Sequence, residues 1–362
     1  MSRGKYYLPT LDGWRAIACS MVIICHGSIS MGMPQLRDYF GVPGVDIFFG
    51  LSGFLITTLL LGQETRSGTV SLRSFYSRRV FRIIPAALLF LSVLWILRMF
   101  GLVEITTGRW VSALLFLANY SNAQQSWYVG HFWSLAVEEH FYLIWPATLL
   151  LVRSNRKRLA LVLFAICFVD VWRMVDYKYH LTWSGSTDLW THRTDIAADG
   201  ILFGVAYALA LADENTGSKL RKLLRSPFVL PLSIGIFVLT CVLPEHVGWK
   251  TSFLLLSLRS AVVPAMILAT LSNPGSVVGR ILEFKALRFV GLISYSLYLW
   301  QELFLPLEPL KGLTAIQWFP LNVALAVICA ILSFYLVETP MIRLGQRLGG
   351  RKAKLVERTA AI

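Results

Sequence analysis

The sequence predicts an all-α fold, a polytopic integral membrane bundle of about ten transmembrane helices. Hydrophobic residues make up 56% of the 362 residues, the mean hydropathy is +0.62, and only 15% of the residues are charged. This composition is typical of membrane proteins and unlike that of soluble domains. The apolar residues also form runs close to the roughly 20 residues that cross a bilayer. We expect no appended soluble domain.

The predicted membrane helices follow one another along the chain with short connections. They cover residues 11–31, 45–62, 83–103, 132–152, 159–177, 196–212, 228–243, 252–271, 289–305 and 319–338. Residues 104–131 contain an apolar stretch too short to span, and we expect them outside the membrane or re-entrant. Residues 213–227 are expected to be a basic, solvated connection. We expect one membrane domain over residues 1–343 and a basic cytoplasmic tail over residues 344–362.

The net charge of +14 is best explained by membrane topology. Most lysines and arginines lie in short clusters in alternate connections between the apolar runs. This is the distribution expected of cytoplasmic loops. We therefore expect both termini in the cytoplasm and contact with anionic lipids. The clusters form no basic stripe, which disfavours a nucleic-acid partner. The five cysteines lie singly in apolar runs, so we expect neither a disulfide framework nor a metal site.

The first predicted helix carries two polar groups that require explanation. Arg15 and His26 are eleven residues apart, almost three helical turns, so their side chains share one face about 16 Å apart. In hydrocarbon such groups must face a bundle interior or a wet cavity. The orientation places His26, and Asp46 of the next helix, towards the outer side. Arg15 lies nearer the inner side.

These residue types suit group transfer across the membrane. An imidazole with a pKa near 6.5 can take a proton from a hydroxyl and return it, and a carboxylate such as Asp46 can orient the ring. Arg79 and Arg82 share a helix face at the cytoplasmic boundary, where guanidinium groups can hold phosphates. Each feature also has a structural explanation, since a membrane histidine is often a core residue and positive-inside sorting explains many arginines. The hypothesis depends on their combination.

Further polar residues fall into three groups. Glu138 and Glu139 lie inside the run 132–152, and adjacent helical residues point about 100° apart, so at most one is expected to face a given cavity. Asp170 and Arg173 are three apart and are expected to form a structural ion pair. The outside loop before residue 196, which holds Arg193 and leads to Asp199, is a candidate acceptor-binding wall. Small residues Gly50, Ser52 and Gly53 indicate either close helix packing or backbone access to a substrate.

Short motifs in a fixed order resemble acyltransferase family 3, membrane enzymes that move acyl groups onto glycans and other hydroxyl-bearing acceptors. The motifs are LDGWRAIACSMVIICH with its Arg-x10-His spacing, GVDIFFGLSGFLI, RVFR, HFWSLAVEEHFYLIWP, SYSLYLWQ and ETP. Together they span residue 8 to about 343. No GxSxG, P-loop, HExxH or GxGxxG pattern accompanies them, so hydrolase, nucleotide and zinc-peptidase chemistry has no direct signal.

The resemblance implies a donor, an acceptor and residue roles. The donor would be cytoplasmic acyl-CoA, with acetyl-CoA expected, and no metal is implied. The acceptor would be a hydroxyl of a cell-envelope or exported glycan, and the implied location is a bacterial inner membrane. The implied catalytic residues are His26 as general base, Asp46 and Glu139. The implied donor-binding residues are Arg15, Arg79 and Arg82. The implied acceptor-binding residues are Glu138, Arg193 and Asp199.

Three positions depart from the family pattern, and two other functions stay open. Gln301 stands where SYSLYLWH commonly has histidine, His140 where EEQFY has glutamine, and Ala197 where TDTRADG has arginine. We expect no fused esterase-like domain, so direct transfer or a separate partner would complete the reaction. One alternative is a proton-coupled transporter that uses His26, Asp46 and Glu139 as a relay. The other is a non-catalytic membrane scaffold.

Overall fold

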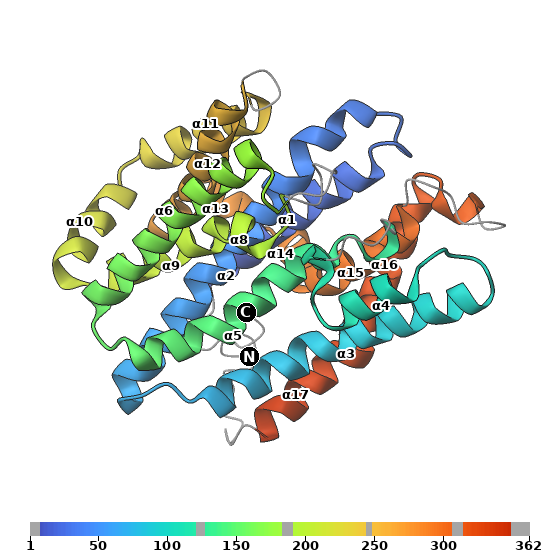
Figure 1. The fold of residues 1–362 in the computed structure, drawn as a ribbon, viewed down its shortest axis with the longest axis horizontal. Helices are drawn as coiled ribbons and strands as arrows, with labels where there is room; N and C mark the ends of the chain where they lie inside the picture. Colours follow the sequence, from blue (N-terminus) through green and yellow to red (C-terminus); the bar gives the residue numbers. More distant parts are fainter. Residues whose placement is uncertain (1–7, 121–126, 183–190, 244–247, 306–313, 349–362) are drawn as a thin grey trace. The chain divides into compact units, whose positions relative to one another are not determined.

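The computed structural model contains α-helices, short 3-10 helices and one π-helical turn, with no strand in the part of the chain it describes (Figure 1). It describes residues 8–120, 127–182, 191–243, 248–305 and 314–348. The predicted all-α class is confirmed. The tail beyond residue 348 and the loop 183–190 lie outside the described residues.

The helices overlap the predicted apolar runs, although two helices begin 8 and 11 residues before the predicted starts at 45 and 83, and several runs are divided. The long helices are α1 (Pro9–Gly27), α2 (Arg37–Ser67), α3 (Leu72–Met99), α5 (Phe132–Leu151), α6 (Asn155–Tyr179), α9 (Asp199–Ala212), α11 (Val229–Val242), α12 (Trp249–Ser272) and α16 (Leu321–Ser333). Shorter helices are α4 (Thr107–Leu114), α8 (Thr194–Ala197), α10 (Glu214–Leu224), α13 (Val277–Leu282), α14 (Lys285–Leu292), α15 (Ser294–Phe304) and α17 (Thr339–Leu348). The π-helical turn Phe334–Glu338 joins α16 to α17.

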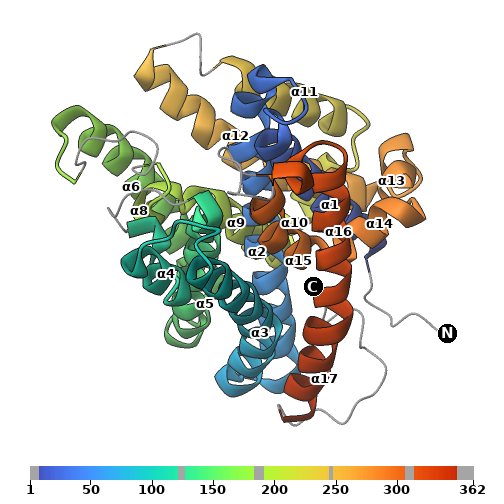
Figure 2. The same ribbon diagram turned by 90° about the vertical axis from the view of Figure 1, so that its right-hand side faces the viewer.

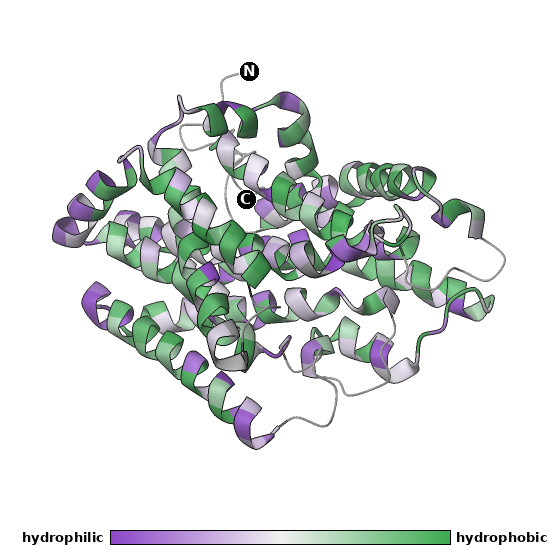
Figure 3. Ribbon diagram, turned by 90° about the horizontal axis from the view of Figure 1, so that it is seen from above, coloured by the Kyte–Doolittle hydropathy of each residue, from purple (hydrophilic) through white to green (hydrophobic). Residues whose placement is uncertain are grey.

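The protein is an integral membrane protein, since several of its helices are long and apolar enough to cross a bilayer. Among the described residues four satisfy both criteria, and a bent pair formed by α10 and α11 raises the number to five. Figure 3 shows hydrophobic residues along most helices. The count of ten spans stays a prediction, because several predicted spans correspond to helices shorter than 18 residues.

The chain folds into two compact units that are not consecutive in sequence. Unit 1 comprises residues 1–41, 71–132 and 284–362, and unit 2 comprises residues 42–70 and 133–283. The boundaries fall within α2 and α5, so each of these helices contributes residues to both units. The sequence, treated as one membrane domain, did not reveal this division.

Unit 1 is built on helices from both ends of the chain. α1 packs against α14 and α15, and α3 lies beside α17 in both ribbon views (Figures 1 and 2). The approach of α14 to α1 requires a glycine, because a Cβ at Gly291 would lie 1.8 Å from the backbone oxygen of Asp12. This packing places the first predicted helix directly against the SYSLYLWQ segment, which forms α15.

Unit 2 packs α9 against α6, α10 and α12, with α11 beside α12. The close contact of α2 with α9 also depends on a glycine, since a Cβ at Gly53 would lie 2.0 Å from the carbonyl oxygen of Ile201. The small residues at this position therefore serve helix packing, one of the two roles considered from the sequence. Ser52, beside it, makes a hydrogen bond described below.

The basic connection predicted over residues 213–227 is mostly exposed, as expected, but it is largely helical, which the sequence analysis did not predict. Most of this segment is α10, and Asp213 caps it by accepting a hydrogen bond from the Thr216 backbone N–H at 2.9 Å. That bond holds the pKa of the Asp213 carboxyl below its usual value. The high polarity of the segment hid a helix whose Asp cap and basic last turn are standard terminal signals.

Candidate active site

His26 lies near the end of α1, where the fold surrounds it with groups from α15 and from the short helix Trp127–Val129. Its Nδ1 is 2.8 Å from the Gln301 side-chain oxygen and 3.9 Å from Glu302 Oε1. The Trp127 ring meets the imidazole edge-on at 5.0 Å. The side chain retains 18% exposure, so the ring is mostly enclosed but not sealed.

The bond to Gln301 fixes which ring nitrogen can act as a base. An amide oxygen only accepts hydrogen bonds, so Nδ1 of His26 must donate and therefore carries the hydrogen. The lone pair is then on Nε2, and no hydrogen bond to Nε2 is found among the described residues. This is the arrangement a general base needs, with one nitrogen anchored and the other available.

Glu302 joins His26 to a second histidine. Its Oε2 is 2.5 Å from Nδ1 of His131, and its Oε1 accepts the His131 backbone N–H at 3.0 Å. The Glu302 side chain is only 3% exposed, and that of His131 is fully buried. In the sequence analysis His131 is only the first residue of the HFWSLAVEEHFYLIWP motif, and Glu302 was missed, because 171 residues separate the two. The only local signal was the polar pair QE after the apolar SYSLYLW.

Arg15, predicted to share a face with His26, is buried and paired with Asp12. Its Nη1 lies 3.1 Å from Asp12 Oδ1 one turn earlier on α1. Sequence reasoning missed Asp12, which supplies the compensating charge that a buried guanidinium requires. The pair places a charge-balanced group at the opposite end of α1 from His26.

Arg79 and Arg82 lie on α3 in the same unit and are half-buried. The Arg79 guanidinium carbon is 5.9 Å from the centre of the Phe75 ring. Arg82 interacts electrostatically with Glu338, whose carboxylate also accepts a hydrogen bond from Ser296. The structure therefore places the three arginines predicted to bind the donor in unit 1, together with His26.

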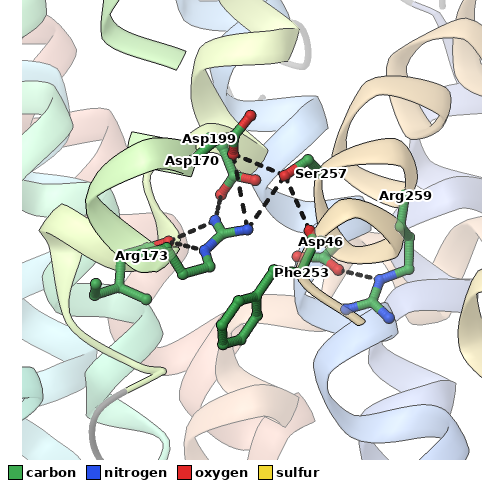
Figure 4. Close-up of polar contacts among 8 residues, drawn as sticks. Asp46, Asp170, Arg173, Asp199, Phe253, Ser257 and Arg259 are labelled. Atoms are coloured by element: carbon green, nitrogen blue, oxygen red, sulfur yellow. Dashed lines mark hydrogen bonds and ion pairs between the residues drawn. The ribbon is translucent and has the colours of Figure 1, made fainter. Parts of the chain in front are cut away.

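The predicted acceptor-side residues lie in unit 2, where buried charges form a network (Figure 4). Arg173 on α6 lies 2.7 Å from Asp199 and 3.8 Å from Asp170, and it also donates to the Ile196 backbone oxygen at 2.6 Å. The predicted ion pair between Asp170 and Arg173 is confirmed. Asp199 is the closer partner, with a side chain 4% exposed.

Asp46 is bonded to a residue that sequence reasoning did not single out. Its Oδ2 lies 2.5 Å from Nε of Arg259 on α12, and both side chains are largely buried. The ring of His26 has Gln301 as its hydrogen-bond partner, and the carboxylate of Asp46 has Arg259. The orienting role of Asp46 toward His26 stays a prediction.

The two helix α5 carboxylates differ in their partners. Glu138 accepts hydrogen bonds from Ser52 at 2.6 Å and from Tyr142 at 3.2 Å, so it belongs to a cluster with two hydroxyl groups. Glu139 is half-buried one position further on. In the loop before α8, Arg193 pairs with Asp195 at 2.8 Å. In the described part of the chain no group of three or more His, Cys, Asp or Glu residues is arranged to hold a metal ion.

Comparison with known proteins connects this site to a chemistry. A family model described as "Acyltransferase domain" matches residues 8–338. The chain belongs to acyltransferase family 3. This match includes the helices that carry His26, Arg15, Asp46 and Glu302. The resemblance inferred from the short motifs is confirmed.

Three curated relatives are named as O-acetyltransferases, two of them as putative. The chain is 31% identical over 366 residues to the peptidoglycan O-acetyltransferase of Listeria monocytogenes, with 93% of this chain and 56% of the relative covered. It is 30% identical to a putative peptidoglycan O-acetyltransferase of Bacillus subtilis, with 96% and 56% covered. It is 28% identical to a putative O-acetyltransferase of Staphylococcus aureus, with 92% and 57% covered. The chain thus spans a little over half the length of these relatives, and no solved structure matches it.

Proposed function

We propose that this protein is a membrane O-acetyltransferase that transfers the acetyl group of acetyl-CoA from the cytoplasmic side to a hydroxyl of a cell-wall glycan. The observation that carries the proposal is the anchored imidazole of His26, with Nδ1 bonded to Gln301 and Nε2 available as a base. Family membership and the relatives, which are named as peptidoglycan O-acetyltransferases, support the reaction class and the acceptor class.

The proposed reaction is a direct acyl transfer. Nε2 of His26 takes the proton of the acceptor hydroxyl while the hydroxyl oxygen attacks the carbonyl carbon of the thioester. A carbon–oxygen bond forms, the carbon–sulfur bond breaks, and the imidazolium returns the proton to the leaving thiolate. The products are the O-acetyl ester and free coenzyme A, with no net change in protons or electrons.

The donor requires cationic groups, because coenzyme A carries phosphates. Arg79 and Arg82 are half-buried on one face of α3, and a guanidinium binds phosphate with paired, charge-assisted hydrogen bonds. Arg15 is a third candidate on the donor path, although its pairing with Asp12 leaves less charge available. Glu138, Glu139, Arg193 and Asp199 remain candidates for the acceptor side, in a unit without His26.

The proposal is tested with the purified full chain in proteoliposomes, supplied with acetyl-CoA labelled in the acetyl group and a glycan with free hydroxyls. We expect labelled ester on the glycan and an equal amount of coenzyme A thiol. Movement of a solute without thiol release would overturn the proposal and favour the proton-coupled transporter. An Arg79→Gln, Arg82→Gln variant should raise the KM for acetyl-CoA more than it lowers kcat.

A further inference from the structure

We propose that Glu302 is a positioning residue that serves His26 and His131 together, so that these three side chains act as one set in catalysis. This inference rests on the proposed function of His26. It adds a buried carboxylate and a second imidazole that the sequence did not assign. The first observation is that one carboxylate lies beside both rings, 3.9 Å from His26 Nδ1 and 2.5 Å from His131 Nδ1.

The position of Glu302 suits the charge that develops on His26 during transfer. When Nε2 takes the hydroxyl proton, the ring becomes a cation inside a mostly enclosed site. A carboxylate 3.9 Å from Nδ1 stabilises that cation, and its effect is strong because Glu302 is only 3% exposed. Glu302 is also in the last turn of α15, where the negative end of the helix dipole favours a nearby cation.

His131 explains how the carboxylate is kept in place. A buried carboxylate requires donors, and His131 supplies two, its backbone N–H at 3.0 Å and its ring Nδ1 at 2.5 Å. Aromatic rings of Phe90 and Tyr298 lie edge-on to the His131 ring at 5.4 Å, and Tyr298 donates to the His131 carbonyl. The carboxylate is therefore fixed from the side away from His26.

Gln301 and Glu302 have different roles toward the His26 ring. The amide oxygen of Gln301 accepts the Nδ1 hydrogen and sets the tautomer of the ring, without adding a charge. Glu302, one residue further along α15, supplies the charge from a second direction. The sequence analysis treated Gln301 as a departure from a histidine position. In the structure it is the direct hydrogen-bond partner of His26.

The test compares kcat and KM of four full-length single variants and one double variant in proteoliposomes with labelled acetyl-CoA. Glu302→Gln keeps the shape and removes the charge, Glu302→Asp keeps the charge, and His131→Asn keeps a donor near the position of Nδ1. The control is Glu64→Gln in unit 2. It removes the charge of a carboxylate that lies 2.7 Å from Arg158 of the same unit. Thermal unfolding in detergent shows that each variant is folded.

We expect Glu302→Gln to lower kcat on the order of 100-fold with little change in either KM, as loss of a charge felt mainly in the transition state does. Glu302→Asp should recover at least a tenth of the wild-type kcat. The double variant Glu302→Gln, His131→Asn should be no slower than Glu302→Gln alone, because the two residues act as a unit. Glu64→Gln should keep the wild-type kcat.

Two results would overturn the inference. The first is a folded Glu302→Gln variant with a kcat within twofold of wild type. The second is additive losses for Glu302 and His131, which would mean that they act independently. If Glu302→Gln does not fold, Glu302→Asp still decides, since the inference places its kcat between a tenth and a half of the wild-type value, whereas a purely structural carboxylate would change stability and leave kcat unchanged. Failure of the wild-type protein to form any acetyl ester would instead contradict the proposed function itself.

Discussion

At the scale of single residues, several buried charges in the described part of the protein occur in matched pairs. Arg15 lies against Asp12, Arg173 against Asp199, and Arg259 against Asp46. A buried charge without a partner costs several kcal/mol, so each pair constrains which single substitutions the fold tolerates. This gives the polar residues of unit 2 a structural role in addition to any role toward the acceptor.

The Arg173→Met substitution should destabilise the protein by about 3–5 kcal/mol, because it leaves Asp199 buried without its cation. Adding Asp199→Asn to Arg173→Met should recover part of the loss, since the orphaned charge is removed. Thermal unfolding in detergent measures both effects. Equal stability of Arg173→Met and wild type would show that the pair is not buried as described.

A double-mutant cycle tests the pair formed by Asp46 and Arg259. Asp46→Asn and Arg259→Met should each destabilise the protein, and the cycle should give a coupling energy of about 1–3 kcal/mol. The same cycle applied to kcat separates structure from catalysis. If the only role of Asp46 is to pair with Arg259, the Arg259→Met substitution should lower kcat as much as Asp46→Asn does. A far larger loss in Asp46→Asn would support the predicted role at His26.

At the scale of elements, close helix packing depends on glycines whose neighbours leave no room for a side chain. Gly53 on α2 faces the carbonyl oxygen of Ile201 where α9 crosses. Gly235, in the middle of α11, has open space around the position of a Cβ. The two residues form a matched pair for testing the role of packing.

Gly53→Ala should destabilise the protein by about 1–3 kcal/mol, because overpacking forces two backbones apart. Gly235→Ala should have the opposite sign and stabilise by about 0.5–1 kcal/mol, since alanine is the better helix former. Thermal unfolding of the two variants side by side provides the comparison. Similar effects at both positions would contradict the close approach of α2 and α9.

The elements also show what could be predicted from the sequence. Hydropathy located most helices to within a few residues, because each apolar run carries its own signal. The partners of His26 could not be found in this way, since Gln301 is 275 residues away. The Arg259 partner of Asp46 is 213 residues away and lies in an apolar run. The helix α10 was missed because its polar composition resembles that of a loop.

At the scale of the whole molecule, the orientation predicted from basic clusters can be tested independently of catalysis. Single cysteines at Thr216 in α10 and at Thr106 before α4, in a chain without its five native cysteines, should react differently with an impermeant maleimide. In intact cells we expect the maleimide to label Thr106→Cys and not Thr216→Cys. After permeabilisation we expect it to label both variants. The reverse pattern would invert the proposed donor and acceptor sides.

The central claim is that His26 is the base for acyl transfer to a glycan, and mass spectrometry of envelope glycans tests it most directly. Cells that lack the gene are complemented with wild-type protein, His26→Ala or the control Gly235→Ala, at equal membrane levels. We predict O-acetylated glycan with wild type and the control, and none above background with His26→Ala. O-acetylation that persists in a folded His26→Ala variant would contradict the account.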